Sequence, residues 1–205
     1  RLSREQMHEL LEKSYGHVKQ LSSLLHDIST ITRITDASSK IECEEVNINN
    51  ILSGLQKEME MYPVEKRMRL NLNVPDEMVI NGNLGLIESI FTNLMSNALL
   101  YSGGRDIFIT ATDEGSCYMF VFADNGIGVD KEHLSKLFER FYRIDSGRSR
   151  KMGGTGLGLS IVKNAILFHN GDVKVSNRKQ GGLQFIFTLQ KNLQTILYKF
   201  NYKTF

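Results

Sequence analysis

The chain has 205 residues and a formal net charge of +2 at pH 7, with 41% hydrophobic and 23% charged residues. This is the composition of an ordinary globular protein, and it excludes collagen-like, low-complexity and wholly disordered classes. Because acidic and basic residues are interspersed, we expect no nucleic-acid partner, and because the longest apolar runs are far too short for a membrane span, we expect this fragment to be soluble.

The N-terminal region predicts one long helix. From 2 to about 34 the sequence has no proline, and apolar residues recur at spacings of three, four or seven. The resulting stripe is of heptad type. It comprises Met7, Leu11, Val18, Leu21, Leu25 and Ile28. Because no second helix of matching pattern lies beside it in the sequence, we expect the stripe to pack against a copy of itself or against a segment outside this chain.

Helices and strands alternate after a polar stretch at 36–45. Asn49 is expected to cap a helix that runs to Met61, and a strongly apolar helix is expected from Leu84 to Gly103-Gly104. Shorter helices are predicted at 131–138 and from about 156 to 169. Strands are predicted at 69–74, 78–80, 106–112, 117–124, 172–177 and 183–189. The mixed order predicts a two-layer α/β sandwich, in which helices cover one face of a mixed sheet.

Two polar segments in this region have the composition of ligand sites. Asn93 and Asn97 are one helical turn apart, and amides can bind Mg²⁺ or phosphate without adding negative charge, although a pair of satisfied core amides explains the two residues better when they are taken alone. Asp124 ends the most apolar strand, where a buried carboxylate needs a donor such as the exocyclic amine of adenine. Gly126 and Gly128 would let a flat ring approach the backbone, but Asp-Asn-Gly is also a common turn.

Two further segments complete the pattern. The glycine-rich stretch 153–159 precedes a helix whose first amides could bind phosphate, although such stretches also form flexible loops. The stretch 138–143 has the sequence Phe-Glu-Arg-Phe-Tyr-Arg, whose arginines would stabilise charge on a phosphoryl group if a triphosphate lay beside them.

Taken in chain order, the four segments resemble the boxes of sensor histidine kinases in order and spacing. The segment with Asn93 and Asn97 resembles the N box, that from Asp124 to Gly128 the G1 box, 138–143 the F box and 153–159 the G2 box. The resemblance spans most of 46–191 and extends, through three of the boxes, to the ATPase superfamily that contains gyrase, the ninety-kilodalton heat-shock chaperone and the mismatch-repair ATPase. It implies a Bergerat-type ATP-binding fold after a dimerisation helix. The implied domains are 1–45 for the second helix of a dimerisation hairpin with its linker, 46–191 for the catalytic ATP-binding domain, and 192–205 for a tail of unknown role.

The resemblance also implies ATP and Mg²⁺ as cofactors. By it, Asn97 would coordinate Mg²⁺, Asn93 would hold water or phosphate, and Asp124 would accept a hydrogen bond from the adenine amino group. Gly126 and Gly128 would shape the base pocket.

The remaining implied contacts are to the phosphates. Gly154, Gly156 and Gly158 would supply backbone amides, with Thr155 and Leu157 in the same segment, Arg143 at the terminal phosphate and Tyr101 at the border of the nucleotide. Asn93 and Arg143 are the expected catalytic residues. One departure is Leu100, where many relatives have a lysine, so a phosphate contact is lost unless Arg140, Arg143, Arg148 or Lys151 replaces it.

The acceptor histidine is expected to lie outside this chain. His26-Asp27 superficially has the acceptor form, but too few residues separate His26 from the strand-like start near Glu45 to hold a second dimerisation helix.

The resemblance therefore implies a histidine kinase that passes phosphate to a response-regulator receiver domain. The full-length protein would be a homodimer at the cytoplasmic side of the bacterial inner membrane, with membrane segments that are missing here. The alternatives are a nucleotide-binding regulator without transfer activity, favoured by Leu100, and a serine kinase of the anti-sigma type.

Overall fold

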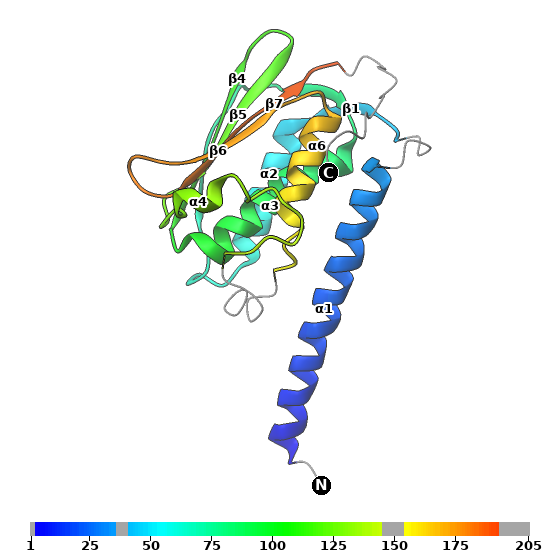
Figure 1. Ribbon diagram of the computed structural model, residues 1–205, viewed down its shortest axis with the longest axis vertical. Coiled ribbons are helices and arrows are strands. Elements are labelled where there is room, and N and C mark those ends of the chain that lie inside the picture. Colours follow the sequence, from blue (N-terminus) through cyan, green and yellow to red (C-terminus); the bar gives the residue numbers. More distant parts are fainter. Residues whose placement is uncertain (1–2, 36–40, 145–153, 193–205) are drawn as a thin grey trace.

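The computed structural model describes residues 3–35, 41–144 and 154–192, in which helices cover one face of a twisted sheet (Figure 1). The sheet has the strand order β2-β4-β5-β7-β6, with β2 and β4 parallel and the other neighbours antiparallel. Its strands are β2 (Arg69–Asn73), β4 (Asp106–Asp113), β5 (Cys117–Asp124), β6 (Val173–Asn177) and β7 (Leu183–Gln190). The mixed sheet of the predicted α/β sandwich is confirmed.

The helical layer carries the N-box segment at its centre. The helices are α2 (Ile48–Met61), α3 (Leu84–Asn97) and α6 (Gly158–Phe168), with a short α4 (Lys131–Leu134). A separate two-stranded antiparallel sheet joins β1 (Glu44–Asn47) to β3 (Val79–Gly82). Because α3 contacts both α2 and α6, its side chains are held from both sides.

The core lies between α3 and the central strands. Phe91 of α3 meets Phe120 of β5 edge to face at 5.6 Å and Phe187 of β7 at 5.9 Å, while Phe120 and Phe187 stack at 5.1 Å. All three are almost completely buried, which stabilises each by about 1.5–3 kcal/mol relative to exposure. Strand 117–124 is thus central, as its apolar sequence predicts.

The cap of α2 differs from the sequence prediction. Asn47, rather than Asn49, is the cap, and its side-chain oxygen accepts from the Asn50 amide at 3.2 Å. Asn49 lies inside the helix and bonds across to the β3 region, donating to the Pro75 carbonyl at 2.9 Å and accepting from the Met78 amide at 2.9 Å. Both asparagines are suitable caps, and the long-range partners of Asn49 decide between them.

The end of α3 has a geometry that its sequence did not predict. The helix continues as a π-helical turn, η1 (Ala98–Ser102), and ends at Gly103 with a φ of 66°. The predicted end at Gly103-Gly104 is confirmed, since glycine readily adopts this left-handed conformation. π-helical turns occur frequently at functional sites, and this one lies where the predicted site residues meet.

The N-terminal helix α1 (Arg4–Thr35) projects away from the sheet and contacts the rest only near its C-terminal end (Figure 1). Ile31 and Ile34 are buried there. By contrast, Leu11, Val18 and Leu25 each expose 62–64% of their surface, so the predicted apolar stripe is uncovered in the single chain. Its pairing in a dimer stays a prediction. No helix among the described residues is both long and apolar enough to cross a membrane.

His169 joins the end of α6 to the start of α3. Its Nδ1 donates to the Ala165 carbonyl at 2.7 Å, and its Nε2 accepts from the Asn83 amide at 3.1 Å. This pattern requires neutral imidazole, and burial lowers the pKa of His169 from its ordinary 6.5.

We expect the free energy of unfolding to fall as the pH drops below about 6.5, because the unfolded state binds a proton at His169 more readily than the folded state. A glutamine can donate and accept at similar positions, so His169→Gln should flatten this pH dependence in urea unfolding between about pH 5 and pH 7.5. His8→Gln on the exposed face of α1 is the matched control. An equally steep dependence in parent and His169→Gln would contradict this role.

Candidate nucleotide-binding site

The four predicted segments converge on the C-terminal end of α3 and on η1. The Ile127 amide donates to the Ser102 carbonyl at 2.9 Å, which brings the end of β5 to η1. The Phe141 amide donates to the Gly156 carbonyl at 2.8 Å, which joins 138–143 to the glycine segment. Gly154 lies against Tyr101 of η1 and Gly158 against Asn93 of α3, so segments far apart in the sequence meet at one short stretch of helix, as the resemblance implies.

Asp124 is a buried carboxylate at the end of β5. Only 6% of its surface is exposed, and its Oδ1 accepts from the Gly126 amide at 2.8 Å and the Leu183 amide at 3.4 Å. Burial raises the pKa of Asp124 above its usual range, and these two amides offset part of that rise. Both donors reach the same oxygen, so the carboxylate keeps capacity to accept from a ligand amine.

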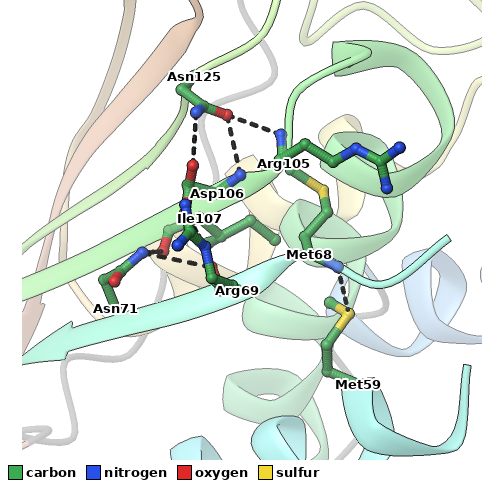
Figure 2. A network of polar contacts seen from close by, with 8 residues as sticks. All are labelled: Met59, Met68, Arg69, Asn71, Arg105, Asp106, Ile107 and Asn125. Atoms are coloured by element: carbon green, nitrogen blue, oxygen red, sulfur yellow. Dashed lines mark hydrogen bonds and ion pairs between the residues drawn. The ribbon is translucent and has the colours of Figure 1, made fainter. Parts of the chain in front are cut away.

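Asn125 holds this loop in place, and sequence reasoning missed it. Its Oδ1 accepts from the Arg105 and Asp106 amides at 2.9 Å each, and its Nδ2 donates to Asp106 Oδ2 at 2.7 Å (Figure 2). Arg69 Nε lies 2.7 Å from the other carboxylate oxygen of Asp106 and, by its hydrogen bond, lowers the pKa of that group. The Asp-Asn-Gly sequence indicated a turn, but the partners on β4 could be seen only in the fold.

The glycines of the G1 segment lie against the protein's own chain. A Cβ at Gly126 would overlap the Ser102 carbonyl oxygen, and Gly128 has a φ of 70°. A Cβ at Gly128 would lie 2.6 Å from Asn177 Oδ1, which accepts from the Val129 amide at 3.0 Å. The two glycines are therefore required by the backbone packing that places Asp124.

The two asparagines of α3 differ in hydrogen bonding. Asn93 Nδ2 donates to the Ser89 carbonyl at 2.8 Å, and its Oδ1 faces Gly158, where a Cβ would lie 2.6 Å away. Asn97 Nδ2 is buried and has no hydrogen-bond partner among the described residues. The core-amide explanation therefore fits Asn93, whereas Asn97 keeps a buried polar group that a ligand would satisfy.

Arg143 is the second residue with buried donors left over. Within the described ranges, its Nε and Nη2 have no hydrogen-bond partner. Its Nη2 lies 4.0 Å from the Cβ position of Gly154, and Tyr101 Oη is close enough to that position to exclude any side chain there. Two buried guanidinium nitrogens without an acceptor are costly, so this corner fits a phosphate group.

The segment 154–158 faces both the site and α1. Thr155 Oγ1 donates to Asp27 Oδ2 of α1 at 2.8 Å and accepts from the Leu157 amide at 3.2 Å. The Leu157 side chain is buried with Ile31 and Ile161 rather than turned to a ligand. Thr155 and Leu157 thus use their side chains to dock on α1, and the N-cap residue Leu157 makes no side-chain capping bond to the first turn of α6.

The backbone of the same segment packs closely against the backbone of the F segment, 138–143. Gly156 has a φ of 75°, and a Cβ there would lie 2.9 Å from Phe141 Cα. Leu100 is half-buried in η1, and Arg140 is exposed. Arg148 and Lys151, which could replace the missing lysine, lie outside the described residues.

The residues present fit a nucleotide with a bound cation. Nowhere in the described part of the chain do three acidic, histidine or cysteine side chains gather as a metal site. An amide oxygen such as that of Asn97 is an Mg²⁺ ligand when phosphate oxygens and water supply the rest of the coordination. The unpartnered donors of Asn97 and Arg143 and the buried Asp124 are the groups such a ligand would satisfy.

Comparisons with known proteins agree with this geometry. The chain is 29% identical over 179 residues to the sensor-like histidine kinase SenX3 of Mycolicibacterium smegmatis, covering 87% of this chain and 47% of that protein. It is 31% identical over 178 residues to the sensor histidine kinase WalK of Bacillus subtilis, covering 85% of this chain and 29% of WalK. The chain therefore spans less than half the length of these curated relatives.

A solved structure shares the fold over nearly the whole chain. The full-length ShkA structure in complex with AMPPNP matches with a TM-score of 0.73 and 27% identity, covering 92% of this chain and 39% of ShkA. The model of the histidine kinase-, DNA gyrase B- and HSP90-like ATPase family matches residues 82–193, which contain all the site segments described above. The chain belongs to this ATPase family.

Proposed function

We propose that the chain is the catalytic part of a two-component sensor histidine kinase, and that it transfers the γ-phosphoryl group of ATP to a histidine outside this chain. The observation that best supports this proposal is that Asp124, Asn97 and Arg143 lie around η1. Asn97 and Arg143 have buried donors that no described residue satisfies. The resemblance of 138–143 to the F box supports the kinase branch of the family.

Each residue has a role that follows from its position. Asp124 accepts a hydrogen bond from the adenine amino group, using the acceptor positions of its carboxylate that the Gly126 and Leu183 amides leave open. This selects adenine over a base that has a carbonyl in place of the amino group. Arg143 binds the terminal phosphate and steadies its charge as the phosphoryl group moves. Asn97 holds Mg²⁺, which neutralises charge on the phosphates, and Asn93 positions the start of α6 against them.

The acceptor is assigned outside the chain because of where α1 ends. Helix α1 runs without a break from Arg4 to Thr35, and only 36–43 separate it from β1. This placement supports α1 as the helix that directly precedes the ATP-binding domain, with the acceptor on an earlier helix. His26 lies within α1. The division into 1–45, 46–191 and 192–205 is part of the same proposal.

The full-length protein would act with partners that this chain does not include. As a two-component kinase it would pass phosphate to a response-regulator receiver domain and would dimerise through the exposed stripe of α1. It would lie at the cytoplasmic side of the bacterial inner membrane through segments outside this chain. The kinship with SenX3 and WalK supports these assignments.

Nucleotide binding by calorimetry tests the site. We expect the chain to bind ATP in a Mg²⁺-dependent manner, and Asp124→Asn to weaken binding by roughly 10- to 100-fold because a donor would face the adenine amine. Asn97→Ala should remove most of the Mg²⁺ dependence. If the parent binds no ATP, or if both variants bind like the parent, the site assignment is wrong.

The Asp124→Asn variant also carries its own folding control. Because the folded-state pKa of Asp124 is raised, the folded protein loses stability relative to the unfolded chain as the pH rises through that pKa. At neutral pH the buried, ionised carboxylate therefore destabilises the fold. An asparagine removes this cost and keeps an oxygen for the Gly126 amide. We therefore expect Asp124→Asn to unfold at the same or a higher temperature than the parent at neutral pH, so lost binding cannot be attributed to unfolding.

A second candidate is a nucleotide-binding regulator that does not transfer phosphate, and Leu100 favours it. Leu100→Lys would restore a charge-assisted phosphate contact worth about 1.5–3 kcal/mol, so we expect it to raise ATP affinity by roughly 10- to 100-fold. The control is Thr112→Lys, which adds the same charge on β4. Unchanged affinity would show that another cation already occupies this role.

Transfer itself separates the two candidates. Radiolabelled ATP is added to this chain together with a separately supplied acceptor hairpin, for the parent and for Leu100→Lys. Labelled histidine from the parent supports the kinase. Label only with Leu100→Lys, or none with either, supports the regulator without transfer activity.

A further inference from the structure

The turn between β6 and β7, 178–182, lies against the end of β5. Within the turn, the Arg178 amide donates to the Gly182 carbonyl at 2.9 Å, and the Gly181 amide donates to the Arg178 carbonyl at 3.2 Å. Gly181 and Gly182 each have a φ of 93°, and a Cβ at Gly182 would overlap the carbonyl oxygen of Asp124. The turn therefore packs directly on the backbone of the residue that we propose binds the base.

The side chain of Arg178 adds a charged hydrogen bond to the same residue. Its Nη1 donates to the Asp124 carbonyl oxygen at 2.6 Å, and its guanidinium lies over the ring of Phe108 on β4, 4.8 Å from the ring centroid. A planar guanidinium can stack on an aromatic face and donate in its own plane at the same time, which an ammonium group cannot do. The stacking on Phe108 thus fixes the direction in which Arg178 donates.

Two further contacts from this hairpin hold the loop around Asp124. The Leu183 amide, at the start of β7, donates to Asp124 Oδ1 at 3.4 Å. Asn177, at the end of β6, donates from its Nδ2 to the Val129 carbonyl at 2.6 Å and accepts from the Val129 amide at 3.0 Å. The hairpin therefore contacts the backbone and the carboxylate of Asp124 and the segment that follows it, so it sets the direction of the second carboxylate oxygen.

The positive charge of Arg178 also favours the ionised form of Asp124. Burial raises the pKa of this carboxyl, and the Gly126 and Leu183 amides and the Arg178 charge act against that rise. An ionised carboxylate accepts hydrogen bonds at both oxygens, whereas the protonated form carries a donor. Arg178 thus favours the form of Asp124 that accepts from an amine.

Charged groups on the neighbouring strand β4 have partners of their own. The Asp106 carboxylate lies 2.7 Å from Arg69 Nε, and Arg105 Nη1 donates to the Glu65 carbonyl at 2.8 Å. Among the described residues, Arg178 is the charged group whose field acts on the Asp124 carboxyl.

We propose that Arg178 is a positioning residue for base recognition, which holds Asp124 so that its carboxylate meets the amino group of adenine. The inference rests on the proposed function, because it takes Asp124 as the residue that binds the base. It assigns a role to a residue outside the four boxes. Because Arg178 acts only through Asp124, its loss should affect the base end of the nucleotide and leave the phosphate end unchanged.

Calorimetry with ATP, ADP and GTP on the full chain tests this assignment. We expect Arg178→Gln to weaken ATP and ADP binding by the same factor, roughly 10-fold, because a hydrogen bond from a charged group is lost. The weaker binding of GTP should not change, so selectivity for adenine falls. Arg143→Ala, at the phosphate end, should instead weaken ATP more than ADP. Lys179→Gln is the matched control, since it removes the same charge from an exposed position of the same turn.

A second measurement needs no nucleotide. The NMR signal of the Asp124 carboxyl carbon, identified by its loss in Asp124→Asn, is followed as the pH is raised. We expect the pKa of Asp124 to be higher in Arg178→Gln than in the parent and unchanged in Lys179→Gln. Arg178→Lys keeps the charge without the planar guanidinium, so it should keep the pKa near that of the parent while ATP affinity stays reduced.

The outcomes separate this inference from the proposed function. A parent that binds no ATP would overturn both. A parent that binds ATP, together with an Arg178→Gln variant that binds ATP and ADP equally well, would overturn the inference alone. An equal loss for GTP would show that the hairpin supports the whole site, and an unchanged pKa of Asp124 would show that Arg178 does not act on the carboxylate. Either result overturns the inference in variants whose thermal unfolding matches that of the parent, and Arg178→Lys gives the affinity comparison if Arg178→Gln does not fold.

Discussion

The site depends on how closely four chain segments approach the C-terminal end of α3 and η1. A side chain at Gly126 would overlap Ser102, one at Gly154 would overlap Tyr101, and one at Gly158 would crowd Asn93. Glycine at these positions is therefore a requirement of packing, before any ligand is considered. The same close packing places Asp124 and Arg143 around one short helical stretch, the proposed nucleotide site.

The hydrogen bond between Thr155 and Asp27 connects this site to α1. Asp27 is 8% exposed, and Ile31 of the same helix packs with Leu157 and Ile161. The glycine segment is thus docked on α1 on one side, and on the other it borders the proposed phosphate site. A displacement of α1 cannot occur without changing the contacts of Thr155, so the position of the N-terminal helix and the geometry of the phosphate-binding segment are physically linked.

The sequence predicted the elements of the fold better than their local partners. Apolar periodicity located α3, the central β5 and the unpaired stripe of α1, because these depend on burial patterns that extend over many residues. It failed where a side chain has partners far away in the chain. Asn49 and Asn47 are equally good caps, and only the contacts of Asn49 near β3 assign the cap to Asn47.

The candidate site follows the same rule. The order of the four boxes identified the residues that gather at η1, because these sequence motifs correspond to one particular arrangement of the backbone. Asn125 was missed because its importance lies in three hydrogen bonds to Arg105 and Asp106, which are distant in sequence. The π-helical form of 98–102 also has no signal in the residue types themselves.

Buried polar groups in this protein divide into two classes that sequence alone does not separate. The buried His169 bonds to two backbone groups, and the half-buried Asn93 donates to the Ser89 carbonyl, so the fold itself accounts for these hydrogen bonds. Asn97 and Arg143 keep buried donors that no described residue satisfies. Because an unsatisfied buried donor costs about 1–3 kcal/mol, a fold gains nothing by keeping several together unless another molecule completes them. The second class therefore marks the surface that a phosphate-bearing ligand would contact, and the first class marks the scaffold that holds that surface in position.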